Sequence, residues 1–239
     1  MVDLAQIWVY LARDPLAALT ATLLAWLAGL KLAALCRWHP AANPVVFAVA
    51  ILVALLLVSG VDYRAYFEGA QFVHFLLGPA TVALAVPLYR QWGYVRASAP
   101  AALLAVVSGG AVAAAVGVAL GWAFGASPAV MASLAPRSVT TPVAMGVAEQ
   151  IGGLPGLTAT VVLASGVVGA TLGPLTLNAA RVRDWRARGL AMGTAAHGLG
   201  TARALSVNAT AGAFSGLGMG LNALATALLL PLLWRLFAG

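Results

Sequence analysis

The sequence predicts an all-α integral membrane protein, a multi-span helical bundle in which two helical segments are broken or re-entrant. Hydrophobic residues make up 62% of the chain and charged residues only 8%, whereas a soluble globular protein carries about 25% charged residues. The apolar stretches are long enough to cross a hydrocarbon core of about 30 Å as helices of roughly 20 residues. They show no strict alternation of apolar and polar residues, so helices are favoured over a transmembrane barrel.

Six apolar stretches are the expected spans, and prolines, glycines and charges mark the joints between them. In chain order they are residues 16–35, 38–61, 69–89, 100–124, 157–177 and 214–233. The fourth is rich in alanine, glycine and valine, and small residues let helices approach closely, so we expect it inside the bundle. We expect residues 1–13 to form a short amphipathic interfacial helix, since Asp3 stands where a signal peptide would be basic.

Two further stretches, residues 127–153 and 189–209, are too polar and too interrupted to be ordinary spans. The first contains three prolines and a Gly-Gly pair, and the second has a glycine on either side of Leu199. Irregular backbone at membrane depth is tolerated where it is buried in protein or lines a cavity. We therefore predict two broken segments within a single membrane domain of residues 1–239.

The basic loops predict how these broken segments are arranged. Cytoplasmic loops carry an excess of Lys and Arg, so the most basic loop, residues 181–188, is expected in the cytoplasm together with the loops at Arg37 and at residues 90–96. All three loops agree only if residues 127–153 enter and leave on the outer face as a hairpin. By symmetry, residues 189–209 form a hairpin from the cytoplasmic side. Two opposed hairpins are typical of a transporter built as an inverted repeat.

Arg137 and Arg203 are the leading candidates for binding a substrate, because each lies in a broken segment among small polar residues. Ionisable residues inside a membrane are costly and mark functional sites by default. The planar guanidinium also matches a carboxylate with two parallel hydrogen bonds. In the alternative reading, each arginine reaches the lipid headgroups or pairs with Glu149.

Polar side chains near these arginines are candidates for the same site. Their hydroxyls can donate to a substrate, or they can bond to backbone carbonyls and cap short helices, and the sequence leaves both readings open. A histidine can bind substrate, carry a proton or be a satisfied structural residue. The candidates for lining the site are Ser138, Thr140, Thr141, His197 and Thr201, those for proton coupling are Glu149 and His197, and weaker candidates are Thr194, Asn178 and Asn222.

Catalytic and metal-binding patterns are missing from the sequence. It has no nucleophile elbow, no HExxH, no CxxC and no phosphate-binding loop. Its one cysteine, Cys36, excludes an internal disulfide and a thiolate metal cluster. The net charge of +7 sits between the apolar spans, so it indicates topology rather than nucleic-acid binding. We expect no enzyme activity, no metal and no cofactor.

Both broken segments resemble sequence blocks of the LrgB/CidB family. Residues 133–145, SLAPRSVTTPVAM, resemble the family's SLAPKSVTTPIAM, and residues 189–204, GLAMGTAAHGLGTARA, resemble its GLAxGTASHGIGTARA. Residues 75–89 and 213–219 are also similar to family members, and the whole resemblance covers residues 16–233.

The chain departs from the family pattern at three places. Arg137 stands where lysine is usual, which keeps the charge, and Ala196 stands where serine is usual. Family members often have an acidic residue just after the TARA motif, where this chain has Leu205-Ser206-Val207. If that acid is a coupling site in relatives, this chain couples differently.

The resemblance implies two rival functions. One is transport, since a plastid relative is a glycolate/glycerate translocator and some bacterial relatives are linked to pyruvate uptake. The other is regulation of murein hydrolases and autolysis, together with a holin-like partner of the LrgA/CidA type. Cationic residues in a broken polar segment favour a small organic anion. We therefore predict a multi-pass plasma-membrane transporter of small monocarboxylates that works by alternating access, with Arg137 and Arg203 on the carboxylate. A homodimer and an LrgA/CidA-like partner are further hypotheses.

Overall fold

The structure, a computed structural model, describes residues 15–38, 42–75, 85–90 and 92–237, and helices are the only regular secondary structure in these ranges. The predicted all-helical class is therefore confirmed. The helices are α2 (Pro15–Leu35), α3 (Pro44–Ser59), α4 (Tyr63–Phe75), α6 (Ala85–Arg90), α7 (Trp92–Ala123), α8 (Pro128–Leu134), α9 (Thr141–Gln150), α10 (Pro155–Ala179), α11 (Trp185–Val207) and α12 (Ala209–Phe237).

Four helices in the described ranges are long and apolar enough to cross a membrane. They match the first, fourth, fifth and sixth predicted spans. In chain order they are Pro15–Leu35, Arg96–Ala123, Pro155–Ala179 and Ala209–Leu236. The second predicted span is α3, which has only 16 residues because Asn43 caps its start and Gly60, at φ 67°, ends it. Of the third predicted span, residues 76–84 lie outside the described residues, as does the predicted interfacial helix at residues 1–13.

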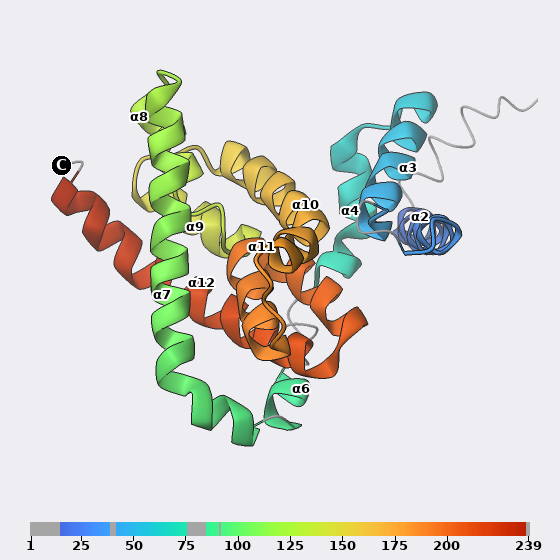
Figure 1. Cartoon of the computed structure of the whole chain (residues 1–239). Helices are drawn as coiled ribbons and strands as arrows, with labels where there is room; N and C mark the ends of the chain where they lie inside the picture. The colour runs from blue at the N-terminus through green and yellow to red at the C-terminus, as the bar shows by residue number, and fades with distance from the viewer. Residues whose placement is uncertain (1–14, 39–41, 76–84, 91, 238–239) are drawn as a thin grey trace, which may run out of the picture. The chain divides into compact units, whose positions relative to one another are not determined.

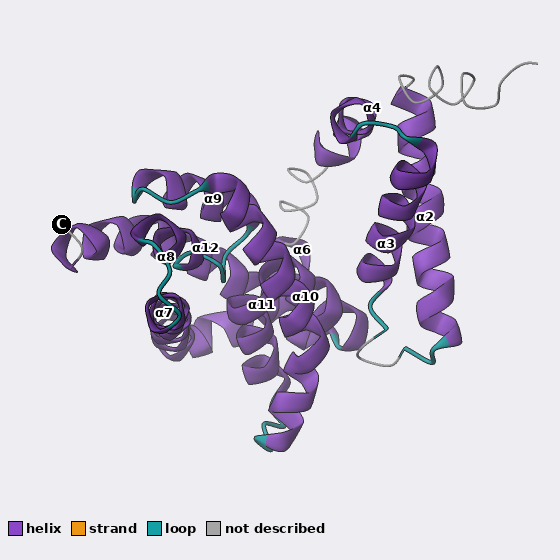
Figure 2. Cartoon of the chain, turned by 90° about the horizontal axis from the view of Figure 1, so that it is seen from above, coloured by secondary structure: helices purple, strands orange, loops and turns teal. Residues whose placement is uncertain are grey.

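The chain divides into two compact units, residues 1–83 and residues 84–239. In the first unit, α3 and α4 pack against α2 (Figure 2). The Oγ of Thr22 on α2 and the hydroxyl of Tyr66 on α4 share a hydrogen bond of 2.7 Å. All the candidate site residues lie in the second unit, so that unit positions the site.

The second unit contains a crossing of α7 and α12 (Figure 1). The two helices meet at Gly110 and Asn222, each near the middle of its helix, and a Cβ at Gly110 would overlap the amide oxygen of Asn222. α10 and α11 run side by side (Figure 2), and α11 also packs along α12. The small residues of α7 thus allow a close helix crossing. The predicted place of this span inside the bundle is wrong for the described residues, because most of α7 is exposed, including Leu104, Val112 and Trp122.

Residues 127–153 form a hairpin, called the first hairpin below, as the sequence predicts. Its helices α8 and α9 have 7 and 10 residues. They are about 10 and 15 Å long at 1.5 Å per residue, so neither can span a bilayer. After α9 the chain returns to α8, because Ser133 Oγ accepts a hydrogen bond from the Leu154 amide at 2.7 Å and the Ser133 carbonyl accepts one from Thr158 Oγ1 at 3.1 Å.

α11 is a second hairpin made of two helical limbs, called the second hairpin below. Helical geometry breaks at Ala196 and His197, and His197 has a φ of 40°, in the left-handed region that residues other than glycine rarely adopt. Beyond the break the chain turns back, because a Cβ at Gly200 would overlap the carbonyl oxygen of Met192. Met192 also shares a buried cluster with Ala204 of the second limb. The predicted second hairpin is therefore present.

The second hairpin begins earlier than the sequence predicts. The Asp184 side chain accepts a hydrogen bond from the Arg186 amide at 2.8 Å and caps the first limb, so the limb starts at Trp185 and not at residue 189. Each hairpin follows a long helix, the first after α7 and the second after α10. The order of elements therefore repeats along the chain, and the inverted arrangement of the two halves stays a prediction.

Candidate functional site where the hairpin tips meet

The tips of the two hairpins are tied together by Asn222 of α12. Its Nδ2 donates to the carbonyl and the Oγ of Ser138 in the first hairpin, at 3.3 and 3.2 Å, and to the carbonyl of Thr194 in the second, at 3.0 Å. Asn222 is 1% exposed. Its Oδ1 is buried without a hydrogen-bond donor among the described residues. One amide thus holds two segments that lie far apart in the sequence.

His197 forms the tip of the second hairpin and is buried there. Its Nε2 lies 3.0 Å from the carbonyl oxygen of Val162 on α10. Since a carbonyl can only accept, Nε2 is the protonated nitrogen in this contact. The carbonyl of His197 accepts from Thr201 Oγ1 at 2.9 Å, and the same hydroxyl lies 3.0 Å from Ser215 Oγ on α12. For Thr201, the backbone-bonding alternative raised by the sequence is present in the structure.

Arg137 lies at the tip of the first hairpin and reaches toward α7. One guanidinium nitrogen donates to the carbonyl of Ala113 at 3.4 Å, and the Arg137 carbonyl accepts from Ser165 Oγ at 3.4 Å. The side chain is half-buried. Within the described ranges it makes no ion pair, and the alternative pairing with Glu149 is not found. This one long hydrogen bond to an uncharged carbonyl leaves most of the five N–H donors of the guanidinium available.

Thr140 and Thr141 stand at the start of α9. Thr140 occupies the N-cap position, but its side chain makes no capping hydrogen bond. Both residues are half-buried, and across the described part of the chain no hydrogen bond is recorded for either hydroxyl. These two hydroxyls are therefore available to a ligand, in contrast to the hydroxyl of Thr201.

Arg203 lies in the second limb of the second hairpin, six residues beyond His197. Its side chain is half-buried, and its Nε is buried with no hydrogen-bond partner among the described residues. A buried donor without an acceptor costs about 1–3 kcal/mol, and more when the group is charged. An anion that reached this nitrogen would remove that penalty.

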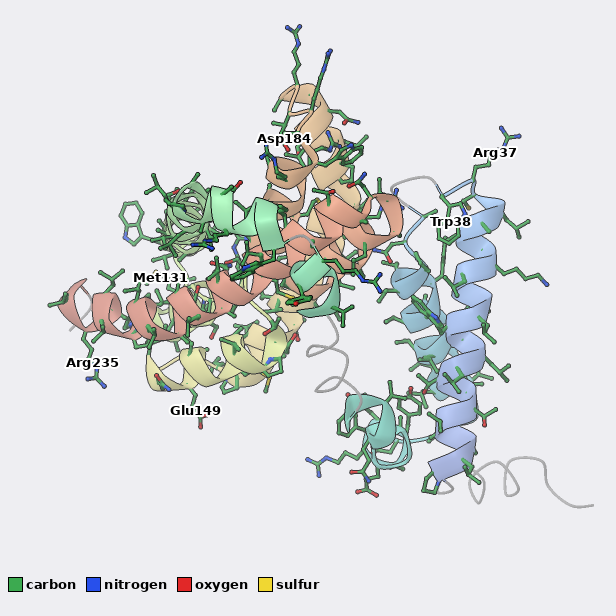
Figure 3. The ribbon with its side chains drawn as sticks, turned by 90° about the horizontal axis from the view of Figure 1, so that it is seen from below. Arg37, Trp38, Met131, Glu149, Asp184 and Arg235 are labelled. Atoms are coloured by element: carbon green, nitrogen blue, oxygen red, sulfur yellow. The ribbon has the colours of Figure 1, made fainter. Side chains whose placement is uncertain are left out.

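Glu149 lies away from the other candidates. It is exposed near the C-terminal end of α9 and points away from the helices (Figure 3). Glu149 was predicted to lie within the membrane site, but it lies in the last turn of α9, which packs against α10, away from the hairpin tip. The structure thus brings Ser138, Thr194 and His197 to the tips. It places Glu149 at the end of the first hairpin opposite the tip, called the open end below.

Asn222 is the residue whose role the sequence understated. The sequence signal for Asn222 was a single amide side chain in the largely apolar span 214–233, and it was predicted only as a weaker candidate.

Metal binding finds no support in the described residues, since no group of three or more His, Cys, Asp or Glu side chains comes together there.

Comparison with known proteins places this architecture in a family. Residues 22–236, which include both hairpins, match the LrgB-like family. The chain belongs to the LrgB-like family. This agrees with the resemblance carried by the two hairpin sequences.

The curated relatives cover most of this LrgB-like chain. The uncharacterized protein YxaC of Bacillus subtilis is 37% identical over 81% of this chain and 84% of its own length. YwbG of the same organism is 36% identical over 80% and 85%. The holin-like protein CidB of Staphylococcus aureus is 32% identical over 83% and 87%. No solved structure matches the chain.

Proposed function

We propose that this LrgB-family membrane protein carries small organic anions across the plasma membrane by alternating access, with Arg203 of the second hairpin binding the carboxylate. The observation that carries the proposal is the buried Nε of Arg203, a cationic donor without an acceptor in the described part of the chain. Broken helices meeting inside a bundle are typical of transporter binding sites. A carboxylate is the natural acceptor for a planar guanidinium.

The first hairpin supplies the remaining contacts in this proposal. Arg137 has donors beyond its single long contact to Ala113, and the hydroxyls of Thr140 and Thr141 are available beside it. A glycolate, glycerate or pyruvate-like monocarboxylate has a charged end and a polar end. A guanidinium suits the first and hydroxyl groups suit the second.

Asn222 gives alternating access a structural basis in this proposal. Moving the first hairpin away from α12 would break the hydrogen bonds that Asn222 donates to the carbonyl and Oγ of Ser138. Moving the second hairpin away would break the hydrogen bond that Asn222 donates to the carbonyl of Thr194. Interhelical hydrogen bonds in membranes contribute about 0.6 kcal/mol on average. The hydrogen bonds of Asn222 therefore add only a modest cost to the separation of either tip.

Uptake into liposomes tests the proposal. We would measure uptake of labelled pyruvate, glycolate and glycerate by the purified protein and by Arg203→Ala, with Arg235→Ala as the control. Arg235 is an exposed arginine that points away from α12 (Figure 3). Saturable uptake that Arg203→Ala loses and Arg235→Ala retains is expected. Equal uptake by both variants would contradict the assignment of Arg203.

The relatives directly favour a second candidate function, because CidB is named a holin-like protein and the relatives described above are not named for transport. In this reading the chain regulates membrane permeability, murein hydrolases and autolysis with an LrgA/CidA-type partner. Release of a trapped dye from the same liposomes, with and without such a partner, measures this activity. Dye release or altered autolysis that persists in Arg203→Ala, without uptake of any carboxylate, would establish the holin-like function instead.

A further inference from the structure

A basic hollow lies where α10 ends and α11 begins, away from the hairpin tips. Its volume is about 340 Å³, and it is lined by Asn178, Arg181, Val182, Arg183, Trp185 and Arg188. We call it the arginine hollow. Figure 3 labels Asp184 in this connection, at the far end of the α10–α11 pair from Glu149.

The charge of the arginine hollow is not neutralised by its neighbours. Asp184 is the acidic residue of this connection, and its carboxylate is paired with Arg186. The Arg186 guanidinium lies 2.6 Å from Asp184 Oδ2. The side-chain hydrogen bond from Arg186 lowers the pKa of Asp184 to about 2, so Asp184 stays ionised and paired. Neither Arg181 nor Arg183 forms an ion pair within the described ranges, and both are exposed.

Arg188 is held in place at the wall of the hollow. It donates to the carbonyl of Val182 at 2.8 Å, and its guanidinium carbon lies 5.4 Å from the centroid of the Trp185 ring. Such a cation–π contact orients the guanidinium and leaves other N–H donors free. One arginine is thus fixed, and two exposed arginines stand beside it.

Arg181 occupies a position at which glycine is usual. The amides of Arg181 and Val182 donate to the carbonyls of Asn178 and Leu177 at 3.0 Å each and close the end of α10. In this type of helix end the residue in the left-handed region is most often glycine, and Arg181 has a φ of 56°. A charged side chain is therefore placed at the rim of the hollow despite the backbone preference.

An apolar stripe on α10 leads to the arginine hollow. Val168, Leu172 and Leu175 are 55%, 49% and 48% exposed, and their spacing of four and three residues places them on one helix face. Asn178, three residues after Leu175, continues this face into the hollow. Trp185 at the hollow is 42% exposed, as is typical of an aromatic side chain at the membrane interface.

We propose that the arginine hollow binds the phosphate of an anionic phospholipid, with an acyl chain lying along the stripe of Val168, Leu172 and Leu175. Arginine forks match phosphate oxygens with paired hydrogen bonds. Basic pockets next to membrane-spanning helices bind lipid headgroups. Free phosphate has the same charged group as the lipid but no acyl chain that could contact the stripe. The apolar stripe therefore favours a lipid over free phosphate. This inference does not depend on whether the protein transports anions.

Titration of a fluorescent phosphatidylglycerol into the full-length protein in uncharged detergent tests the inference. The variant is Arg181→Gln/Arg183→Gln, and the matched control is Arg90→Gln/Arg96→Gln, which removes two exposed arginines elsewhere on the same unit. We expect the variant to weaken binding at least about tenfold, given the contribution of each basic residue to anionic lipid binding. The control should bind like the wild type. Circular dichroism and gel filtration of each protein establish that it is folded.

Three further arms identify the ligand. Unlabelled phosphatidylglycerol should displace the probe, whereas phosphatidylcholine and inorganic phosphate should not. Leu172→Ala/Leu175→Ala should weaken binding of the lipid probe. Equal weakening by the variant and its control would show only general surface charge and overturn the site. Complete displacement by inorganic phosphate, or undiminished binding by Leu172→Ala/Leu175→Ala, would overturn the assignment to a lipid.

Discussion

Asn222 and Gly110 form a coupled pair at the crossing of α7 and α12, and two substitutions test it together. Asn222→Ala removes the amide that holds both hairpin tips. Gly110→Ala adds a methyl group that would overlap the amide oxygen of Asn222. The amide can yield to this methyl only by leaving its hydrogen bonds, so each substitution should disturb the same contacts.

The expected size of the effect follows from these contacts. Asn222 Nδ2 makes three contacts of 3.0–3.3 Å with two hydrogens, and at about 0.5–1.5 kcal/mol per net hydrogen bond they contribute about 1–3 kcal/mol. The membrane average of about 0.6 kcal/mol per bond places the lower limit near 1 kcal/mol. Overpacking at Gly110 would cost about 1–3 kcal/mol. With Asn222 already changed to Ala, the added methyl should cost little.

A double-mutant cycle measures this coupling. We would determine the free energy of unfolding in mixed detergent micelles for the wild type, both single variants and the double variant, with Gly146→Ala as the control. No atom lies within 4 Å of a Cβ at Gly146, so that control should not be destabilised. The double variant should be less destabilised than the sum of the single variants by about 1–3 kcal/mol. Strict additivity would refute the coupling of the two residues and the role of Asn222 as the tie between the hairpins.

Three other predictions concern the packing of the second hairpin, the cap of α11 and the coupling of transport to protons. Gly193→Ala should destabilise the protein by more than about 1 kcal/mol, because its Cβ would overlap a backbone oxygen of α12, whereas Gly198→Ala, with open space around it, should not; thermal unfolding compares them. Asp184→Asn should weaken the cap of α11. Because the pKa of Asp184 is lowered from 3.8 to about 2 in the folded protein, its contribution is complete above pH 4 and is lost as the pH falls toward 2; denaturant unfolding between pH 5 and 2 should show this loss in the wild type and not in Asp184→Asn. If transport is coupled to protons, Glu149→Gln should keep the wild-type response of uptake to a pH gradient, because Glu149 is exposed at the open end, whereas His197→Asn should lose it; the opposite result would move the coupling site to Glu149.

The helical spans were largely predictable because hydrophobicity is a local property. A stretch such as residues 157–177 has to lie in lipid whatever it contacts, and α10 covers it. The first hairpin was also predictable, since the placement of arginines in the loops left no other topology that agreed with the positive-inside rule. The start of the second hairpin was missed by four residues, because the cap at Asp184 was not recognised.

The roles of individual polar residues were less predictable. Sequence alone left open whether the hydroxyls of Thr140 and Thr201 bond to backbone or face a ligand. The structure separates them, because Thr201 bonds to the carbonyl of His197 while Thr140 has no recorded partner in the described residues. Glu149 could not be placed because its position depends on the direction in which α9 runs from the turn.

The amino-acid sequence was enough to show that this chain is a helical membrane protein, where most of its spans lie and which two segments are broken. These properties follow from composition and from residues close together along the chain. The folded protein was needed to show that Asn222 joins Ser138 and Thr194, which lie 84 and 28 residues away from it. Such contacts depend on how closely helices approach at positions like Gly110, and that distance is set by packing, which no local pattern encodes.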